Sequence, residues 1–308
     1  MIAGGEFAPV KILFFLMAML TSASVWAGAE PIRVASLSTV MADLVRDIGG
    51  ERVIVIEIVK PGIDPHIFEP SPGDYKTIAS SRLLLASGLG FEGYLDKLRP
   101  VLEKSGVRLV VGGEVVKPID GACEGHDHSE DHHHHGTLDP HWWQSVSNVQ
   151  LVARQIRDAL NETDPEGRKT FEKNAAALAA RLEDLGKWMR LQIAQLPKRN
   201  RVLVTSHDAL GYFAKDYGFE ILSVQGISTS DQPSSQKVRD LIGRIQERGV
   251  KAIFAESIEN PKVLGQITAE TGAKLGGMIY ADGLGSAETS TYEAVMRHNV
   301  TTIVEALK

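Results

Sequence analysis

Short apolar runs alternate along this chain with amphipathic stretches of helical length. This alternation is typical of βα units built around mainly parallel sheets. The runs that predict strands are Ile32–Ser36, Val53–Val59, Leu83–Ala86 and Leu109–Val111 in the first half, and Arg201–Thr205, Glu220–Val224, Ala252–Ala255 and Leu275–Met278 in the second. The helical stretches between them include Asn148–Glu162, Ser234–Glu247 and Pro261–Thr271. We therefore predict an α/β fold of two lobes, each with a mainly parallel four-stranded sheet.

A long helix is predicted between the two halves. Asp164 and Pro165 form a helix start, with an N-cap followed by Pro at the first helical position. About thirty residues follow that contain no Pro and only two Gly, Gly167 and Gly186, and the stretch stops at Pro197. A helix of this length would run about 45 Å. The expected organisation is an N-terminal lobe over residues 30–163, a rigid linking helix over 164–196 and a C-terminal lobe over 197–308.

The first 29 residues are typical of a cleavable secretory signal. One lysine, Lys11, precedes an apolar run from Ile12 to Leu20, and small residues follow, with cleavage expected near Ala27 or Ala29. The run is shorter than the about 20 residues that a membrane-spanning helix needs. No cysteine lies near the cleavage site to accept a lipid anchor. We expect an exported protein that is not embedded in a membrane.

The charge of the chain narrows the class of partner. The formal net charge is -6 at pH 7. A mildly acidic balance argues against binding to nucleic acid or to an anionic membrane surface, and it is compatible with binding cations. The chain has one cysteine, so no intramolecular disulfide is expected.

Histidine is concentrated in one short internal stretch. Seven of the ten histidines lie between Cys123 and Trp143, mixed with Asp and Glu. Imidazole suits zinc, copper, nickel and iron, and an internal position argues against a cloning tag. We interpret residues 123–138 as an auxiliary metal loop with the ligands His126, His128, His132, His133, His134 and His135. The loop either passes metal to a fixed site or acts as a sink without transfer, and Cys123 is either a soft ligand at its edge or a residue without a metal role.

Three histidines outside the auxiliary metal loop are candidates for a fixed site. His66 and His141 each end an Asp-Pro-His triplet, and His207 follows the apolar run that ends at Thr205. Proline restricts its own backbone and that of the residue before it, so each triplet presents its imidazole from a stiff turn. Loops at the carboxyl ends of strands are also where α/β sheets bind ligands. The C-terminal His298 falls within a helical pattern and is interpreted as a surface or packing residue.

The fourth ligand is expected to be an oxygen. Asp282 follows the last apolar run, and Glu256 is the competing carboxylate. Three neutral imidazoles and one carboxylate make a tetrahedral set for Zn²⁺ at about 2.0–2.2 Å, whereas manganese prefers more oxygens. Copper would bind such a set at least as tightly. Because imidazole must be neutral to bind metal, we expect the affinity to fall below about pH 6.

Two features of the sequence bear on enzymatic activity. A zinc hydrolase needs an open metal position and a general base, but the chain lacks a His-Glu-x-x-His segment, and Asp282 would close the fourth position. The stretch Gly88–Gly93, with Glu114 further on, matches a dinucleotide-binding fingerprint. The same glycines serve equally in a tight strand-to-helix turn, which is the interpretation we favour. We expect no enzymatic activity.

Four ordered motifs give the chain a resemblance to a known family. The segments Asp64–Asp74, Asp139–His141, Ser206–Tyr212 and Tyr280–Asp282 resemble the zinc and manganese solute-binding proteins of bacterial ABC importers, of the metal-binding cluster A-I type. The resemblance covers nearly the whole mature chain. It implies two α/β lobes joined by a rigid helix, one metal between them, and a periplasmic location.

The resemblance also implies the ligands, the metal and the partner. The ligands would be His66 and His141 from the first lobe and His207 and Asp282 from the second. Manganese-preferring members commonly have Glu where this chain has His207, which favours Zn²⁺. The expected function is capture of Zn²⁺ and its delivery to an ABC importer permease, with a periplasmic zinc metallochaperone as a further candidate partner. The alternatives are a manganese- or iron-preferring binding protein, and a zinc buffer or metallochaperone acceptor without a permease.

Overall fold

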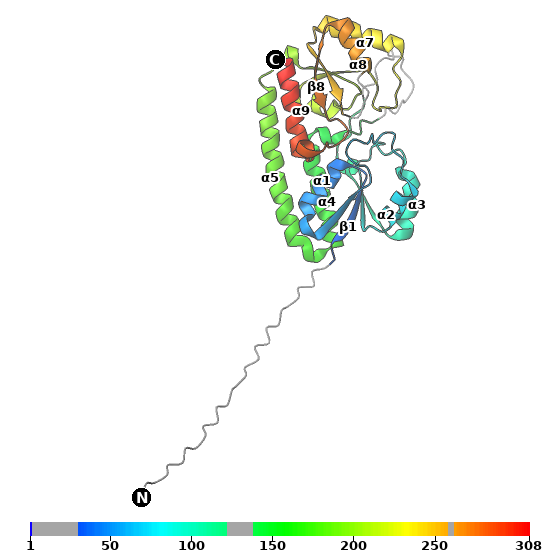
Figure 1. Ribbon diagram of the computed structural model, residues 1–308, viewed down its shortest axis with the longest axis vertical. Coiled ribbons are helices and arrows are strands. Elements are labelled where there is room, and N and C mark those ends of the chain that lie inside the picture. Colours follow the sequence, from blue (N-terminus) through cyan, green and yellow to red (C-terminus); the bar gives the residue numbers. More distant parts are fainter. Residues whose placement is uncertain (2–29, 122–137, 258–261) are drawn as a thin grey trace. The chain divides into compact units, whose positions relative to one another are not determined.

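Four parallel strands form the first sheet of the computed structural model, which describes residues 1, 30–121, 138–257 and 262–308 (Figure 1). In the order β2-β1-β3-β4, the strands are β2 (Val53–Glu57), β1 (Ile32–Ser36), β3 (Leu83–Ala86) and β4 (Arg108–Val111). Alternate residues of β3 enter different core clusters, with Leu83 and Leu85 on one face and Leu84 and Ala86 on the other. Burial of both faces explains why this strand is an unbroken apolar run. The helices α1 (Thr39–Gly49), α2 (Pro72–Ala79) and α3 (Leu95–Ser105) connect these strands.

The second half also contributes four strands, arranged as two hydrogen-bonded pairs. The pairs are β5 (Val202–Thr205) with β6 (Glu220–Ser223), and β7 (Ala252–Glu256) with β8 (Lys274–Ile279), and both are parallel. Strands β5 and β7 lie next to each other without a shared ladder. The predicted four strands are therefore present, but they do not form one continuous ladder. The helices of this half are α6 (Gly211–Tyr217), α7 (Ser235–Arg248), α8 (Lys262–Thr271) and α9 (Tyr292–Leu307).

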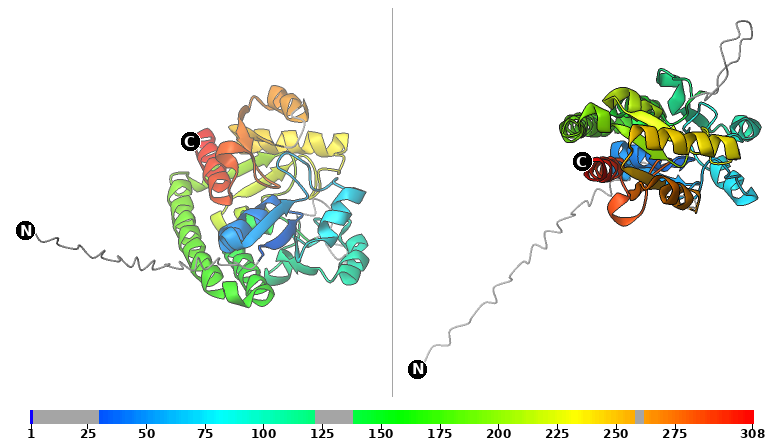
Figure 2. Two further views of the ribbon diagram at one scale, coloured as in Figure 1. Left: turned by 60° about the horizontal axis from the view of Figure 1, so that its bottom comes forward. Right: turned by 90° about the horizontal axis from the view of Figure 1, so that it is seen from above.

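The long helix α5 (Arg168–Ile193) has 26 residues and is about 39 Å long. It begins later than predicted because Pro165–Gly167 forms a separate 3-10 turn, capped by the Asp164 side chain, which also pairs with Arg52. Helix α5 packs against α1 and α4 (Val146–Thr163) from the first half and against α9 from the second (Figures 1 and 2). It therefore contacts helices of both halves along its length.

The hydrophobic core is not divided between the two groups of strands. One cluster includes Leu44 of α1, Leu182 of α5, Phe254 of β7 and Val300 of α9. Two smaller clusters cover the outer faces, one in each half. Residues 31–308 consequently pack as one unit.

Several predicted features lie outside the described residues. These are the signal peptide over residues 1–29, Cys123 and the histidines of the auxiliary loop, His126, His128, His132, His133, His134 and His135. In the part of the chain that the structure describes, no helix combines the length and the apolar character needed to cross a membrane.

Candidate metal centre

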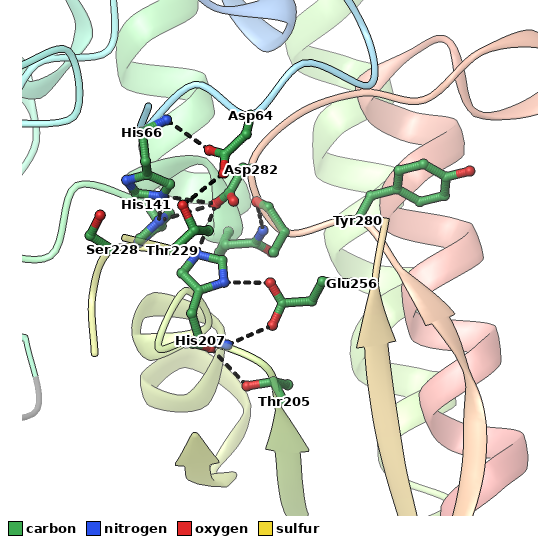
Figure 3. Close-up of polar contacts among 12 residues, drawn as sticks. Asp64, His66, His141, Thr205, His207, Ser228, Thr229, Glu256, Tyr280 and Asp282 are labelled. Atoms are coloured by element: carbon green, nitrogen blue, oxygen red, sulfur yellow. Dashed lines mark hydrogen bonds and ion pairs between the residues drawn. The ribbon is translucent and has the colours of Figure 1, made fainter. Parts of the chain in front are cut away.

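Four side chains that are far apart in the sequence meet at the carboxyl ends of the strands (Figure 3). His66 lies in the loop between β2 and α2, and His141 immediately precedes the 3-10 turn Trp142–Gln144. His207 follows β5, and Asp282 follows β8. The structure thus brings together the four residues that the sequence singled out.

The ligand atoms of these residues all lie within 4.8 Å of one another. Asp282 Oδ1 is 3.2 Å from Nε2 of both His141 and His207, and 3.6 Å from Nε2 of His66. The Nε2 atoms of His66 and His141 are 3.4 Å apart. Ligands about 2.0–2.2 Å from a tetrahedral zinc ion lie about 3.3–3.6 Å from each other, so the four distances of 3.2–3.6 Å are close to those around one such ion.

The donor set itself also fits a cation. Its three imidazole nitrogens and one carboxylate face inward, and the imidazole rings of His141 and His207 are fully buried. The second oxygen of Asp282, Oδ2, is buried without a hydrogen-bond partner. A buried carboxylate oxygen without a partner is costly, and a metal ion at the centre of the group would satisfy it.

Two further carboxylates hold the outer nitrogens of the buried rings. Asp139 Oδ1 lies 2.9 Å from Nδ1 of His141, and Glu256 Oε2 contacts Nδ1 of His207. Glu256 Oε1 also accepts the backbone N–H of His207 at 3.0 Å. Both oxygens of Glu256 therefore contact His207 on the side of the ring away from Asp282. This competing carboxylate is thus not one of the group of four. A carboxylate on Nδ1 fixes the ring so that the Nε2 lone pair points at a metal.

The Asp of each Asp-Pro-His triplet has a role that the sequence analysis missed. Asp64 accepts the backbone N–H of His66 at 2.9 Å, and Asp139 accepts that of His141 at 2.8 Å. Each triplet is thus a turn closed by its own carboxylate, in addition to the restriction imposed by proline. The repeated Asp was the available signal for this contact.

The turn that carries Asp282 is fastened at the residues just before it. The carbonyl oxygen of Ala281 accepts hydrogen bonds from Trp143 Nε1 at 2.8 Å and from Gln144 Nε2 at 2.7 Å. The Asn299 side chain accepts the N–H of Tyr280 and donates to its carbonyl, at 2.9 and 2.7 Å. The His141 segment and α9 together position Asp282.

The charges of the group are strongly coupled. Burial lowers the pKa of His141, but hydrogen bonds to Asp139 and Asp282 outweigh this effect and raise it to about 9. Burial also opposes the charge on His207, yet Asp282 and Glu256 raise its pKa well above the usual value. Burial would raise the pKa of Asp282, but the charge on His207 and hydrogen bonds from the three imidazoles hold it well below its usual range. The metal-free group therefore favours an anionic Asp282 beside protonated His141 and His207.

Two other sequence candidates have structural roles. His298 lies away from the group of four, with Nε2 2.9 Å from the carbonyl oxygen of Met278 and its ring against Tyr280. In the Gly88–Gly93 turn, the buried Glu92 carboxylate accepts the backbone N–H groups of Ser87 and Gly88. A side chain of the protein thus occupies the donors that a phosphate would need, and Gly88 has a φ of 80°, as expected for a tight turn.

Comparison with known proteins places this geometry in context. The family model described as "Zinc-uptake complex component A periplasmic" matches residues 34–306. The chain is 33% identical over 287 residues to the manganese-binding lipoprotein MntA of Bacillus subtilis, covering 91% of this chain and 90% of that protein. It is 31% identical over 279 residues to the iron-binding protein YfeA of Yersinia pestis, covering 90% and 86%. The solved structure of the periplasmic zinc-binding protein TroA of Treponema pallidum superimposes with a TM-score of 0.81 at 28% identity, covering 90% of this chain and 99% of that one.

Proposed function

Because this chain belongs to the family of the periplasmic component A of zinc-uptake complexes, we propose that it captures Zn²⁺ in the periplasm and delivers it to the permease of an ABC importer. Members of this family are metal-binding proteins of ABC importers and not enzymes. In this proposal residues 30–163 and 197–308 are two metal-binding lobes, and residues 164–196 connect them. The proposal also includes export through a signal peptide cleaved near Ala27 or Ala29.

One observation carries the ligand assignment: three imidazole Nε2 atoms converge on Asp282 Oδ1 while Asp282 Oδ2 has no partner. We assign His66, His141, His207 and Asp282 as the ligands. An ion at their centre would satisfy the buried oxygen of Asp282. The carboxylates of Asp139 and Glu256 would increase the basicity of the two buried rings.

The choice of zinc rests on the donor set. The names of the relatives include manganese, iron and zinc, so sequence similarity alone does not identify the bound metal. A set of three nitrogens and one carboxylate suits tetrahedral Zn²⁺, and Mn²⁺ is the weakest binder in the first-row series for a given site. Manganese or iron transport is the second candidate, favoured by the names of the relatives.

The ligand test is metal titration of the exported protein with residues 122–137 replaced by a Gly-Ser linker, so that the auxiliary histidines do not contribute. We expect one tightly bound Zn²⁺ per chain. Single Ala variants of His66, His141 and His207 should each lose more than the about 10–100-fold in affinity that is typical for loss of an outer partner. His298→Ala is the matched control, since it removes a half-buried imidazole outside the group. Tight binding by all three ligand variants would contradict the assignment.

Competition decides the metal. With equal concentrations of Zn²⁺, Mn²⁺ and Fe²⁺ under anaerobic conditions, elemental analysis of the recovered protein should find zinc. Recovery of manganese or iron in its place would favour the second candidate function. Reconstituted uptake with the cognate permease then separates an importer component from a zinc buffer, because only the former supports transport.

A further inference from the structure

The two Asp-Pro-His turns differ in what their carboxylates contact beyond the backbone. Asp139 uses the same oxygen for the ring of His141, at 2.9 Å from Nδ1. Asp64 instead offers its second oxygen, Oδ2, to the hydroxyl of Thr229, which donates at 2.8 Å (Figure 3). Asp64 therefore joins the His66 turn to a segment of the second half that lies 165 residues away in the sequence.

The Thr229 segment is itself attached to the His207 loop. The carbonyl oxygen of Thr229 accepts a hydrogen bond from Gln225 Nε2 at 2.9 Å. The backbone N–H of Gln225 donates to Ser206, and Gly226 accepts from Asp208, both at 2.8 Å. These bonds hold the residues on either side of His207. The Asp64–Thr229 hydrogen bond thus connects the turns that carry His66 and His207.

The His66 ring is restrained differently from the other two imidazoles. Among the described residues, no carboxylate contacts Nδ1 of His66, whereas Asp139 and Glu256 hold the corresponding atoms of His141 and His207. The His66 side chain is 5% exposed, while the other two are fully buried. The ring of His66 packs edge-on against Phe91, which restrains its position but not its outer nitrogen. Its orientation is therefore set largely by the turn that Asp64 closes.

A cavity of about 380 Å³ lies where the joined segments face each other. His66 and Phe91 line it on one side, and Gly226, Ser228 and Asp231 line it on the other. Displacement of the His66 turn from the Thr229 segment would widen this cavity beside the His66 ring. The cavity lined by His66 is therefore a space through which an ion could leave.

We propose that Asp64 and Thr229 are positioning residues that set the rate at which bound metal leaves past His66. This proposal rests on the proposed function of the site. With the hydrogen bond intact, the His66 turn is held against the His207 loop and the ring stays on the metal. Without it, His66 detaches more often and the metal dissociates faster. Association changes little, because the other ligands and their carboxylate partners are unaltered.

The test is stopped-flow release of Zn²⁺ from full-length protein loaded with one equivalent, using a chromogenic chelator in excess. Thr229→Val keeps the shape of the side chain without the hydroxyl, and it should release Zn²⁺ about tenfold faster, within the range typical for loss of an outer partner. Thr229→Ser restores a hydroxyl and should release within twofold of the wild-type rate. Thr301→Val, at an exposed position of α9, is the control for the substitution itself and should match the wild type.

A double-mutant cycle separates this role from a general loosening of the fold. Asp64→Ala and Thr229→Val should each accelerate release, and the double variant should be no faster than Asp64→Ala, because that variant already lacks the bond to Thr229. Additive acceleration would overturn the proposal, as would wild-type release by Thr229→Val or an effect confined to the association rate. Wild-type protein that fails to bind one equivalent would instead overturn the proposed function.

Discussion

One carboxylate oxygen of Asp139 contacts His141 at two atoms, the backbone N at 2.8 Å and the ring Nδ1 at 2.9 Å. It fixes both the turn and the ring plane, and Asp139 is itself buried. We predict that Asp139→Ala lowers zinc affinity by about 10–100-fold, measured by competition with a chelator of known affinity. Asp139→Asn keeps an acceptor oxygen and should lose less. Equal affinity of wild type and Asp139→Ala would show that the ring needs no outer partner.

The pH dependence of binding should extend well above the usual range of histidine. In the metal-free protein the pKa of His141 is raised to about 9 and that of His207 is also raised, so both rings carry protons at pH 7 that the metal must displace. Each displaced proton changes the apparent affinity about tenfold per pH unit. The zinc affinity should therefore rise with pH up to about 9. For imidazoles with the usual pKa, the affinity would stop rising at about pH 6.

The same raised pKa values predict how the stability of the protein depends on pH. A raised His pKa stabilises the metal-free fold fully below about 6.5, and this contribution is lost as the pH rises through about 9. The Tm of the metal-free protein should fall over this interval, and the increase in Tm on adding zinc should grow. Calorimetric titration with zinc in buffers of different ionisation enthalpy measures how many protons are released on binding. Binding at pH 7 without proton release would contradict this prediction.

Asn299 should affect metal binding from a distance. Its side chain is buried and satisfies both backbone groups of Tyr280, two residues before Asp282. Asn299→Ala leaves buried polar groups unpaired, at a cost of about 1–3 kcal/mol each, and loosens the Asp282 turn. We expect lower unfolding free energy and lower zinc affinity together. Asn174→Ala, which removes a hydrogen bond to Ile48 in the first half, should lower stability alone. An unchanged affinity in Asn299→Ala would mean that Ala281 suffices to hold the turn.

Helix α5 is expected to behave as part of the core. Leu182 is fully buried in the shared cluster, whereas Leu191 on the same helix is 69% exposed. Leu182→Ala should lower the unfolding free energy of the metal-free protein by about 2–5 kcal/mol. Leu191→Ala should change it by less than about 0.5 kcal/mol. Denaturant titration distinguishes the two, and similar small effects would show that the helix only connects the halves.

The strands and the three central histidines could be predicted from local patterns in the sequence. Apolar runs such as Leu83–Ala86 are too short for a helix, and their lack of polar residues is typical of a strand buried on both faces. The carboxyl ends of parallel strands lie at one edge of the sheet. Residues that follow such strands, including His207 and Asp282, are therefore brought together by topology. The break between β5 and β7 leaves no comparable mark in the sequence.

The contacts around the four residues could not be predicted in the same way. Asp282 and Glu256 are both carboxylates at strand ends, and only the three-dimensional placement shows that Glu256 contacts the outer nitrogen of His207. The bond from Thr229 to Asp64 and those from Trp143 and Gln144 to Ala281 join segments 137–165 residues apart. No periodicity or spacing encodes pairs at such separations, because they depend on how the elements pack.

The placement of Trp143 gives the protein an internal optical indicator. Its indole ring lies edge-on to His141, with centroids 5.4 Å apart, while its N–H is committed to Ala281 beside Asp282. A change in the charge of His141, or in the position of the Ala281 carbonyl group, alters the surroundings of the buried Trp143 indole. Ultraviolet emission from the unlabelled protein should therefore follow the filling and emptying of the centre in real time, without a dye attached near the ligands.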